Sequence, residues 1–187
     1  MSNPYAAPQS EVEEFGNDHL ISRVFTYHST WVVFIICFLT SFVYLNIFYI
    51  VYWFQSRTAK FNTIVKPHSR IGGGFSTIVY ISVVAFIASL LLFVYTALNV
   101  TPMLDQNPDA FTPQLEQLMV MYFVMLGSGL CLSVLLLVWT FKIRNRLIEV
   151  TRNRLDVNGI LTFFFNIFYL NFKINEAIEM ERRGHRE

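Results

Sequence analysis

The sequence predicts an all-α integral membrane protein with three transmembrane helices, because its apolar residues gather into three long runs that carry no formal charge. Hydrophobic residues make up 54% of the 187-residue chain and charged residues only 14%, whereas about a quarter of the residues in a soluble domain are charged. The three runs cover residues 31–54, 76–99 and 118–141. Each is long enough to cross a hydrocarbon core of about 30 Å as a tilted helix.

Residues 1–29 precede the first run and are predicted to form a flexible acidic tail. Pro4 and Gly16 disfavour regular structure there, and acidic residues outnumber the single Arg23. A short interfacial turn is expected around residues 20–25. No cleavable signal peptide is expected, because the tail lacks a basic start followed by a short apolar core.

Residues 30–142 are predicted to form the transmembrane region. Aromatic residues mark its interfaces with water, since Trp31 opens the first run, Trp53 lies at its end and Trp139 lies at the end of the third. The pair Thr40-Ser41 in the middle of the first run leaves open a re-entrant hairpin with both ends on one side. A plain span is the favoured interpretation, because a lipid-exposed turn would leave backbone hydrogen-bonding groups unpaired.

The charges of the short loops predict the topology. Loop 55–75 contains basic residues and no acid, loop 100–117 contains acidic residues and no base, and basic residues follow the third run at 142–154. Positively charged loops stay on the cytoplasmic side of a membrane. We therefore expect the N-terminus outside and the C-terminus in the cytoplasm.

Residues 143–187 form a C-terminal region of a different kind. Segment 143–157 mixes Arg with Ile, Leu and Val, which predicts a basic amphipathic helix lying on anionic lipid. Segment 159–172 is aromatic but short for a crossing. An interfacial or re-entrant segment is favoured there over a fourth crossing, and 173–187 is expected to form a solvated helix and tail.

Small and polar residues within the apolar segments are the candidates for helix packing or interaction. Small side chains let helices approach closely in lipid, and a hydrogen bond between helices is worth about 0.6 to 2 kcal/mol there. Contact within the protomer is favoured over a seam between subunits. The tetrapeptide at 46–49 recurs at 166–169, which leaves open a diverged repeat or a coincidence. The candidates are Asn46, Tyr49, Tyr52, Trp53, Ser82, Ala85, Ser89, Gly127, Gly129, Asn166, Tyr169 and Asn175.

The groups that catalysis or metal binding requires are scattered along the chain. The four histidines lie in tails and loops without the helical spacing or the cysteine partner of a zinc site. Cys37 and Cys131 lie inside apolar runs, and the glycines at 72–74 are not followed by the Lys-Ser/Thr of a phosphate-binding loop. We expect no enzymatic activity, no metal, no cofactor and no nucleic-acid partner.

Two aromatic elements lie near opposite ends of the hydrophobic region. Residues 49–54 have the pattern Tyr-x-x-Tyr-Trp-Phe, and residues 168–175 have the pattern aromatic-Tyr-Leu-x-aromatic-Lys-Ile-Asn. In these elements the chain resembles a domain-of-unknown-function family of small bacterial inner-membrane proteins. The opening residues 3–8 are similar to the tails of several such proteins. The resemblance implies a bacterial inner-membrane protein without an assigned activity.

The pattern as a whole indicates a non-catalytic membrane scaffold or accessory subunit that acts through helix contacts. Its expected partners are the lipid bilayer, anionic lipid at the basic segment, and a second copy or another membrane protein. An oligomeric pore or small transporter built around Asn46 and the serine-bearing faces is the alternative. A membrane enzyme acting on lipid has the least support, because no acid–base constellation can be named.

Overall fold

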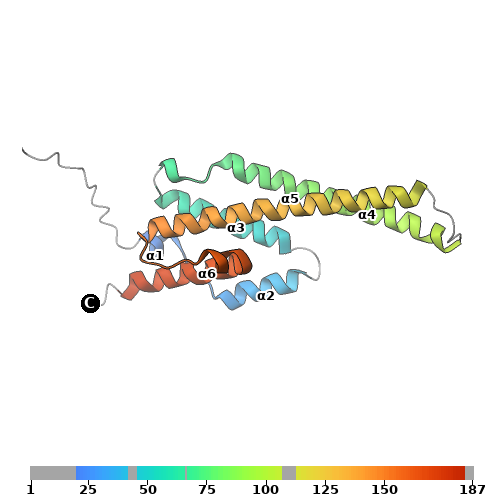
Figure 1. The fold of residues 1–187 in the computed structure, drawn as a ribbon. Coiled ribbons are helices and arrows are strands. Elements are labelled where there is room, and N and C mark those ends of the chain that lie inside the picture. Colours follow the sequence, from blue (N-terminus) through green and yellow to red (C-terminus); the bar gives the residue numbers. More distant parts are fainter. Residues whose placement is uncertain (1–19, 42–45, 66, 107–112, 184–187) are drawn as a thin grey trace, which may run out of the picture.

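The computed structural model describes residues 20–41, 46–65, 67–106 and 113–183, and every regular element in these ranges is helical (Figure 1). The predicted all-α class is therefore confirmed. The acidic tail up to residue 19 lies outside the described residues, and the turn expected around 20–25 is present as a short helix. The elements are α1 (Leu20–Val24), α2 (Thr30–Ser41), α3 (Asn46–Ile64), the 3-10 helix η1 (Pro67–Ser69), α4 (Gly73–Gln106), α5 (Pro113–Val150) and α6 (Gly159–Arg183).

Helices α4 and α5 pack against each other as a long hairpin that extends away from the other helices (Figure 1). They contain the second and third predicted spans, and they are the two described helices long and apolar enough to cross a membrane. Only 11% of the most apolar stretch of α4 and 6% of that of α5 is buried. Helix α5 begins at Pro113, because proline suits the first helical position.

The first predicted span is replaced by two helices, α2 and α3, that pack against each other (Figure 1). The side chain of Asn171 contacts both Thr30, at the start of α2, and Arg57, in the second half of α3. The two helices therefore run antiparallel. A third membrane-crossing helix is not confirmed, and the break after Thr40-Ser41 agrees with the hairpin alternative.

The separate basic amphipathic helix predicted over 143–157 is wrong. Helix α5 continues unbroken to Val150, and a loop then leads to α6. Ile143 and Leu147 are fully buried, and Val157 is only 2% exposed. The apolar residues of this segment pack into the protein core. A protein core and a lipid surface favour the same pattern of polar and apolar residues, so the pattern alone does not distinguish them.

Helix α6 changes direction at Asn166, whose φ of 41° and ψ of −117° lie outside the helical region. Two helical turns precede this residue and a longer helix follows it. Segment 159–172 is therefore not a straight fourth crossing in the described part of the chain.

The hydrophobic core lies at one end of the molecule, where α1, α3, α6 and the last turns of α5 meet. The ring of Trp139 stacks on Phe54 at 5.4 Å, and its Nε1 donates to Thr58 Oγ1 at 2.8 Å. The large side chains buried to 2% exposure or less include Trp139, Phe54, Phe61, Ile21, Ile143, Leu147, Leu170, Ile174 and Ile178. Burial of this many large apolar groups is the main stabilising contribution to this end of the molecule.

Candidate functional site

A buried polar cluster centred on Asn171 joins α3, α6 and the segment before α2. The Nδ2 atom of Asn171 donates to His28 O at 2.8 Å and to Thr30 Oγ1 at 3.3 Å, and its Oδ1 accepts from Arg57 Nη2 at 3.3 Å. One turn later, Asn175 Nδ2 donates to the same His28 carbonyl at 2.6 Å, and Asn175 Oδ1 accepts from the His28 N–H at 3.3 Å. The two amides therefore hold the start of α2 on α6.

Arg57 is a buried cation in this cluster, with only 4% of its surface exposed. Its guanidinium carbon lies 5.5 Å from the ring centroid of Phe25 and 5.4 Å from that of Trp53. Burial lowers the pKa of Arg57, and nearby Tyr49 acts in the opposite direction. The guanidinium stays protonated at neutral pH, because an arginine pKa lies far above 7. Cation–π contacts with the two rings therefore compensate a retained charge.

The charge of Arg57 also acts on its neighbours. The pKa of His28 lies below its ordinary value of 6.5, first because of burial and then because of the positive charges of Arg57 and Lys60. Burial, followed by the charge of Arg57, likewise lowers the pKa of Lys60. The cluster thus carries net positive charge and disfavours a further cation.

The predicted candidates on α6 contact other parts of the same protomer. Asn166 Oδ1 accepts from Thr140 Oγ1 at 2.6 Å, at the point where the helix changes direction. The hydroxyl of Tyr169 accepts from the Asn158 N–H at 2.9 Å. Asn175 alone of these three joins the cluster around Asn171.

Two of the predicted small residues lie in the contact between α4 and α5. Ser89 Oγ lies 2.8 Å from Ser128 Oγ. A Cβ atom at Gly129 would lie 3.1 Å from Cε2 of Phe86, which is tighter than ordinary van der Waals contact. Ser89 and Gly129 therefore lie in a contact within the protomer.

The other small candidates have no described polar contact between α4 and α5. Among the described residues, a Cβ atom at Gly127 would meet nothing within 4 Å, and Ala85 is exposed. The hydroxyl of Ser82 donates to the carbonyl of Ile78 in its own helix at 3.0 Å. The Gly127 side of α5 is consequently open to contact from outside the protomer.

Four of the predicted candidates lie in the first half of α3, at positions 46, 49, 52 and 53. Asn46 is its first residue and is partly buried, and Tyr49 packs against the core. Tyr52 is 69% exposed, whereas Trp53 is buried against Arg57. The Nε1 atom of Trp53 has no hydrogen-bond partner among the described residues. Of the four, the structure thus places Trp53 directly against the buried cluster and Tyr49 near enough to act on the charge of Arg57.

The repeated tetrapeptide occurs at the start of a helical stretch in both places. Asn46 is the first residue of α3, and Asn166 is the break in α6 from which the helix resumes. A short apolar helical segment precedes each copy. The rings of Phe34 and Phe168 lie 5.7 Å apart, so α2 and the second part of α6 are in contact.

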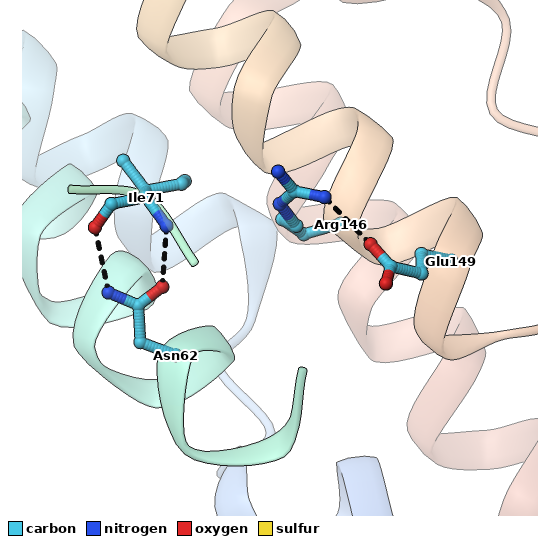
Figure 2. A network of polar contacts seen from close by, with 4 residues as sticks. All are labelled: Asn62, Ile71, Arg146 and Glu149. Carbon is cyan, nitrogen blue, oxygen red and sulfur yellow. Dashed lines mark hydrogen bonds and ion pairs between the residues drawn. The ribbon is translucent and has the colours of Figure 1, made fainter. Parts of the chain in front are cut away.

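An open cavity of about 310 Å³ lies between α3 and α4. Figure 2 shows the turn beside it, where Asn62 Nδ2 donates to Ile71 O at 3.0 Å and Asn62 Oδ1 accepts from the Ile71 N–H at 2.9 Å. The view also shows the ion pair of Arg146 with Glu149 on α5, at 2.7 Å. The described lining consists of Gln55, Thr58, Ala59, Asn62, Ile71, Gly73, Ser76, Thr77 and Tyr80. It offers hydrogen bonds but no carboxylate, histidine or cysteine for acid–base chemistry.

Within the described ranges, no group of three or more His, Cys, Asp or Glu side chains could hold a metal ion. The chain matches no protein-family model, no curated protein sequence and no solved structure. The family resemblance of the aromatic elements therefore stays a prediction.

Sequence reasoning missed Arg57 and Asn171 as members of a site. By sequence, Arg57 is only a loop charge and Asn171 only part of an aromatic element. The sequence does contain a signal, because Asn171 and Asn175 are four residues apart and each directly follows an apolar residue, Leu170 or Ile174. An amide pair at this spacing indicates a polar contact on an otherwise buried face.

Proposed function

We propose that the protein is a non-catalytic, multi-pass membrane scaffold or accessory subunit that binds partners through the outward faces of α4 and α5. In this proposal the two helices cross the bilayer, and the helices around Trp139 form a small domain at one membrane surface. The observation that carries it is the low burial of two long apolar helices. Such a surface would cause aggregation in water, whereas lipid and partner helices cover it.

The open face around Gly127 supports a role in helix contacts. Gly127 has free space at its Cβ position, and Leu126 and Leu130 beside it are exposed. A glycine on an outward face lets another helix approach the backbone closely. This face is our candidate seam for a second copy or for another membrane protein.

Charge at the ends of the hairpin supports an orientation. Arg70 lies just before α4, and Arg152 and Arg154 lie just after α5, and all three are exposed. Positive loops favour the cytoplasmic side, so we place the small domain there, in a bacterial inner membrane. The same residues are suited to bind anionic headgroups.

Cysteine crosslinking tests the seam. In a chain with Cys37→Ala and Cys131→Ala, the variant Gly127→Cys is expected to form a crosslinked species in native membranes. Ser128→Cys is the matched control, because its neighbour on α4 is Ser89 of the same protomer. If neither variant forms a crosslinked species and no membrane protein copurifies with the chain, the proposal is contradicted.

The pore alternative has less support from the hairpin. Ser82, Thr96 and Ser133 each donate their hydroxyl hydrogen to a carbonyl of their own helix. The donor hydrogen of each hydroxyl is therefore already used within the protomer and is not available to a hydrated path. Ion or solute flux into liposomes that contain verified inserted protein would favour a pore instead of a scaffold.

A further inference from the structure

The short apolar segments beside the α4–α5 hairpin fit a single lipid leaflet. We propose that α2, residues 46–54 of α3 and residues 159–165 of α6 enter only the leaflet on the side of the basic loops, so that the chain crosses the bilayer twice. The inference rests on the proposed function, because it takes α4 and α5 as the crossing helices. The lipid of that one leaflet is the partner of these segments.

Trp139 marks the level at which α3 meets the membrane surface. Its ring stacks on Phe54 of α3 and lies 5.9 Å from Phe75 in the first turn of α4. Further along α3, Asn62 pairs with Ile71 just before α4 begins. The C-terminal half of α3 is therefore at the end of the hairpin that carries the basic loops. Its N-terminal half runs from Trp139 in the direction of the lipid.

The lengths of these segments match one leaflet. Residues 46–54 rise about 13.5 Å as a helix, and the 12 residues of α2 rise about 18 Å. Half of a hydrocarbon core of about 30 Å is about 15 Å. Helix α2 is therefore long enough to reach the midplane and residues 46–54 nearly so, and neither segment is long enough to reach the far surface. By contrast, the 34 residues of α4 and the 38 of α5 exceed the full thickness.

Contacts with α6 hold the start of α2 at the same end as the basic loops. The carboxylate of Glu181 accepts from the N–H groups of Ile21 at 3.1 Å and Ser22 at 2.8 Å, which fixes α1 on α6. Asn171 and Asn175 fix the carbonyl of His28 nearby. The ring of Phe25 lies 4.6 Å from that of Phe61, so the segment before α2 lies beside the last turns of α3. The start of α2 and the end of α3 therefore lie on the same side of the bilayer. The chain between them cannot cross the bilayer once.

The exposed side chains of these segments suit lipid. Helix α2 contains no charged residue and exposes large apolar side chains, with Trp31 at 74%. In residues 159–165 the side chain of Phe164 is 72% exposed. The surface is joined to the α4–α5 hairpin through α3, which packs on α5. At its border, Lys142 Nζ lies 4.1 Å from the ring centroid of Phe75, a position from which a cation reaches headgroups.

Sidedness of labelling tests the inference in liposomes of phosphatidylcholine and phosphatidylglycerol. The full chain with Cys37→Ala and Cys131→Ala receives one cysteine at an exposed position: Thr26→Cys, Asn153→Cys or Gln117→Cys. A membrane-impermeant maleimide is added before and after detergent, and the labelled fraction is measured. We expect equal fractions at 26 and 153, and the complementary fraction at 117. Arg23→Cys is a second reporter on α1 and is expected to follow position 26.

The outcomes separate this inference from the proposed function. If positions 23 and 26 follow 117 while 153 does not, residues 31–54 cross the bilayer, and the single-leaflet inference is overturned with the α4–α5 crossing intact. If 153 and 117 are labelled to the same fraction from one side, the hairpin itself does not cross. That second result would overturn the proposed function as well as the inference.

Discussion

Burying a cation such as Arg57 in an apolar core costs free energy unless other groups replace its water. Two aromatic faces and one amide oxygen do so here, from Phe25, Trp53 and Asn171. The side chain of Asn171 has two roles, because its oxygen accepts from Arg57 and its nitrogen donates to the carbonyl of His28. Asn171 is therefore the residue through which α3, α6 and the start of α2 depend on one another.

Replacing this amide should be costly. Asn171→Leu is expected to lower the free energy of unfolding in detergent by about 2 to 4 kcal/mol, because it leaves a buried guanidinium without its acceptor. The double variant Arg57→Met with Asn171→Leu should recover part of this loss, since it removes the charge as well. Chemical denaturation followed by fluorescence measures both. A double variant less stable than Asn171→Leu alone would contradict this account of Arg57.

The pKa of His28 predicts a dependence of stability on pH. Burial and the charges of Arg57 and Lys60 lower the pKa of His28 in the folded state, so the unfolded state binds more protons just below pH 6.5. The free energy of unfolding is then largest above pH 6.5 and falls as the pH drops through that window. His28→Gln should flatten this part of the curve. The test compares melting temperatures of both chains at pH ~7.5 and ~5.5, where parallel changes would refute the role of His28.

At the scale of elements, the sequence was sufficient for α4 and α5, because a long run of apolar residues without a single charge rarely forms anything but a helix in lipid. It was not sufficient for residues 31–54, where hydropathy alone does not distinguish one helix from two antiparallel ones. The distinction depends on Asn171, whose contact with Thr30 joins residues far apart in the chain. Thr40 gives a weak local signal, since its hydroxyl donates to the carbonyl of Ile36 near the end of α2.

The segment 143–157 failed as a prediction for a related reason. Arg residues among Ile, Leu and Val fit a lipid surface and a protein core equally well, and only the partner element decides. Here that partner is the core, where Ile143 and Leu147 are buried. Arg144 Nε donates to the carbonyl of Val157 at 2.9 Å, so the loop after α5 folds back on the helix.

The change of direction in α6 can be tested at Asn166. Its positive φ is a conformation that glycine adopts most easily. Asn166→Gly should preserve the break and cost about 1 kcal/mol for the lost bond with Thr140, whereas Asn166→Val should cost about 1 to 3 kcal/mol more through backbone strain. Thr140→Val removes the same bond without changing the backbone and serves as the control. Equal stability of the Gly and Val variants would rule out a strained backbone.

The packing of α4 on α5 can be tested with its two glycines. Gly129→Leu should destabilise the hairpin by about 1 to 3 kcal/mol, because the new side chain overlaps Phe86. Gly127→Leu is the matched control, since nothing lies within 4 Å of its Cβ position. Thermal melting of both variants in detergent compares them. Equal melting temperatures would contradict the described contact between the two helices.

At the scale of the whole molecule, two parts are stabilised by different means. The core around Trp139 buries large apolar side chains together with the polar cluster around Asn171, so apolar burial is its main stabilising contribution. The α4–α5 hairpin buries little. In the bilayer of the proposed function, its internal backbone hydrogen bonds stabilise it. Trp139 lies on α5 where the two parts join, and its stacking on Phe54 connects them.

These two parts should therefore unfold separately in lipid vesicles. In a chain with Trp31→Phe and Trp53→Phe, Trp139 is the single fluorescent reporter of the core, and Trp53→Phe removes no described hydrogen bond. Urea weakens apolar burial in water, so it should shift the emission of Trp139 to longer wavelength and remove the circular dichroism of the core helices. The signal of α4 and α5 should persist, because a helix in lipid has no water with which to exchange its hydrogen bonds. Complete loss of helical signal in the same transition as the Trp139 shift would mean that the hairpin is not protected by lipid.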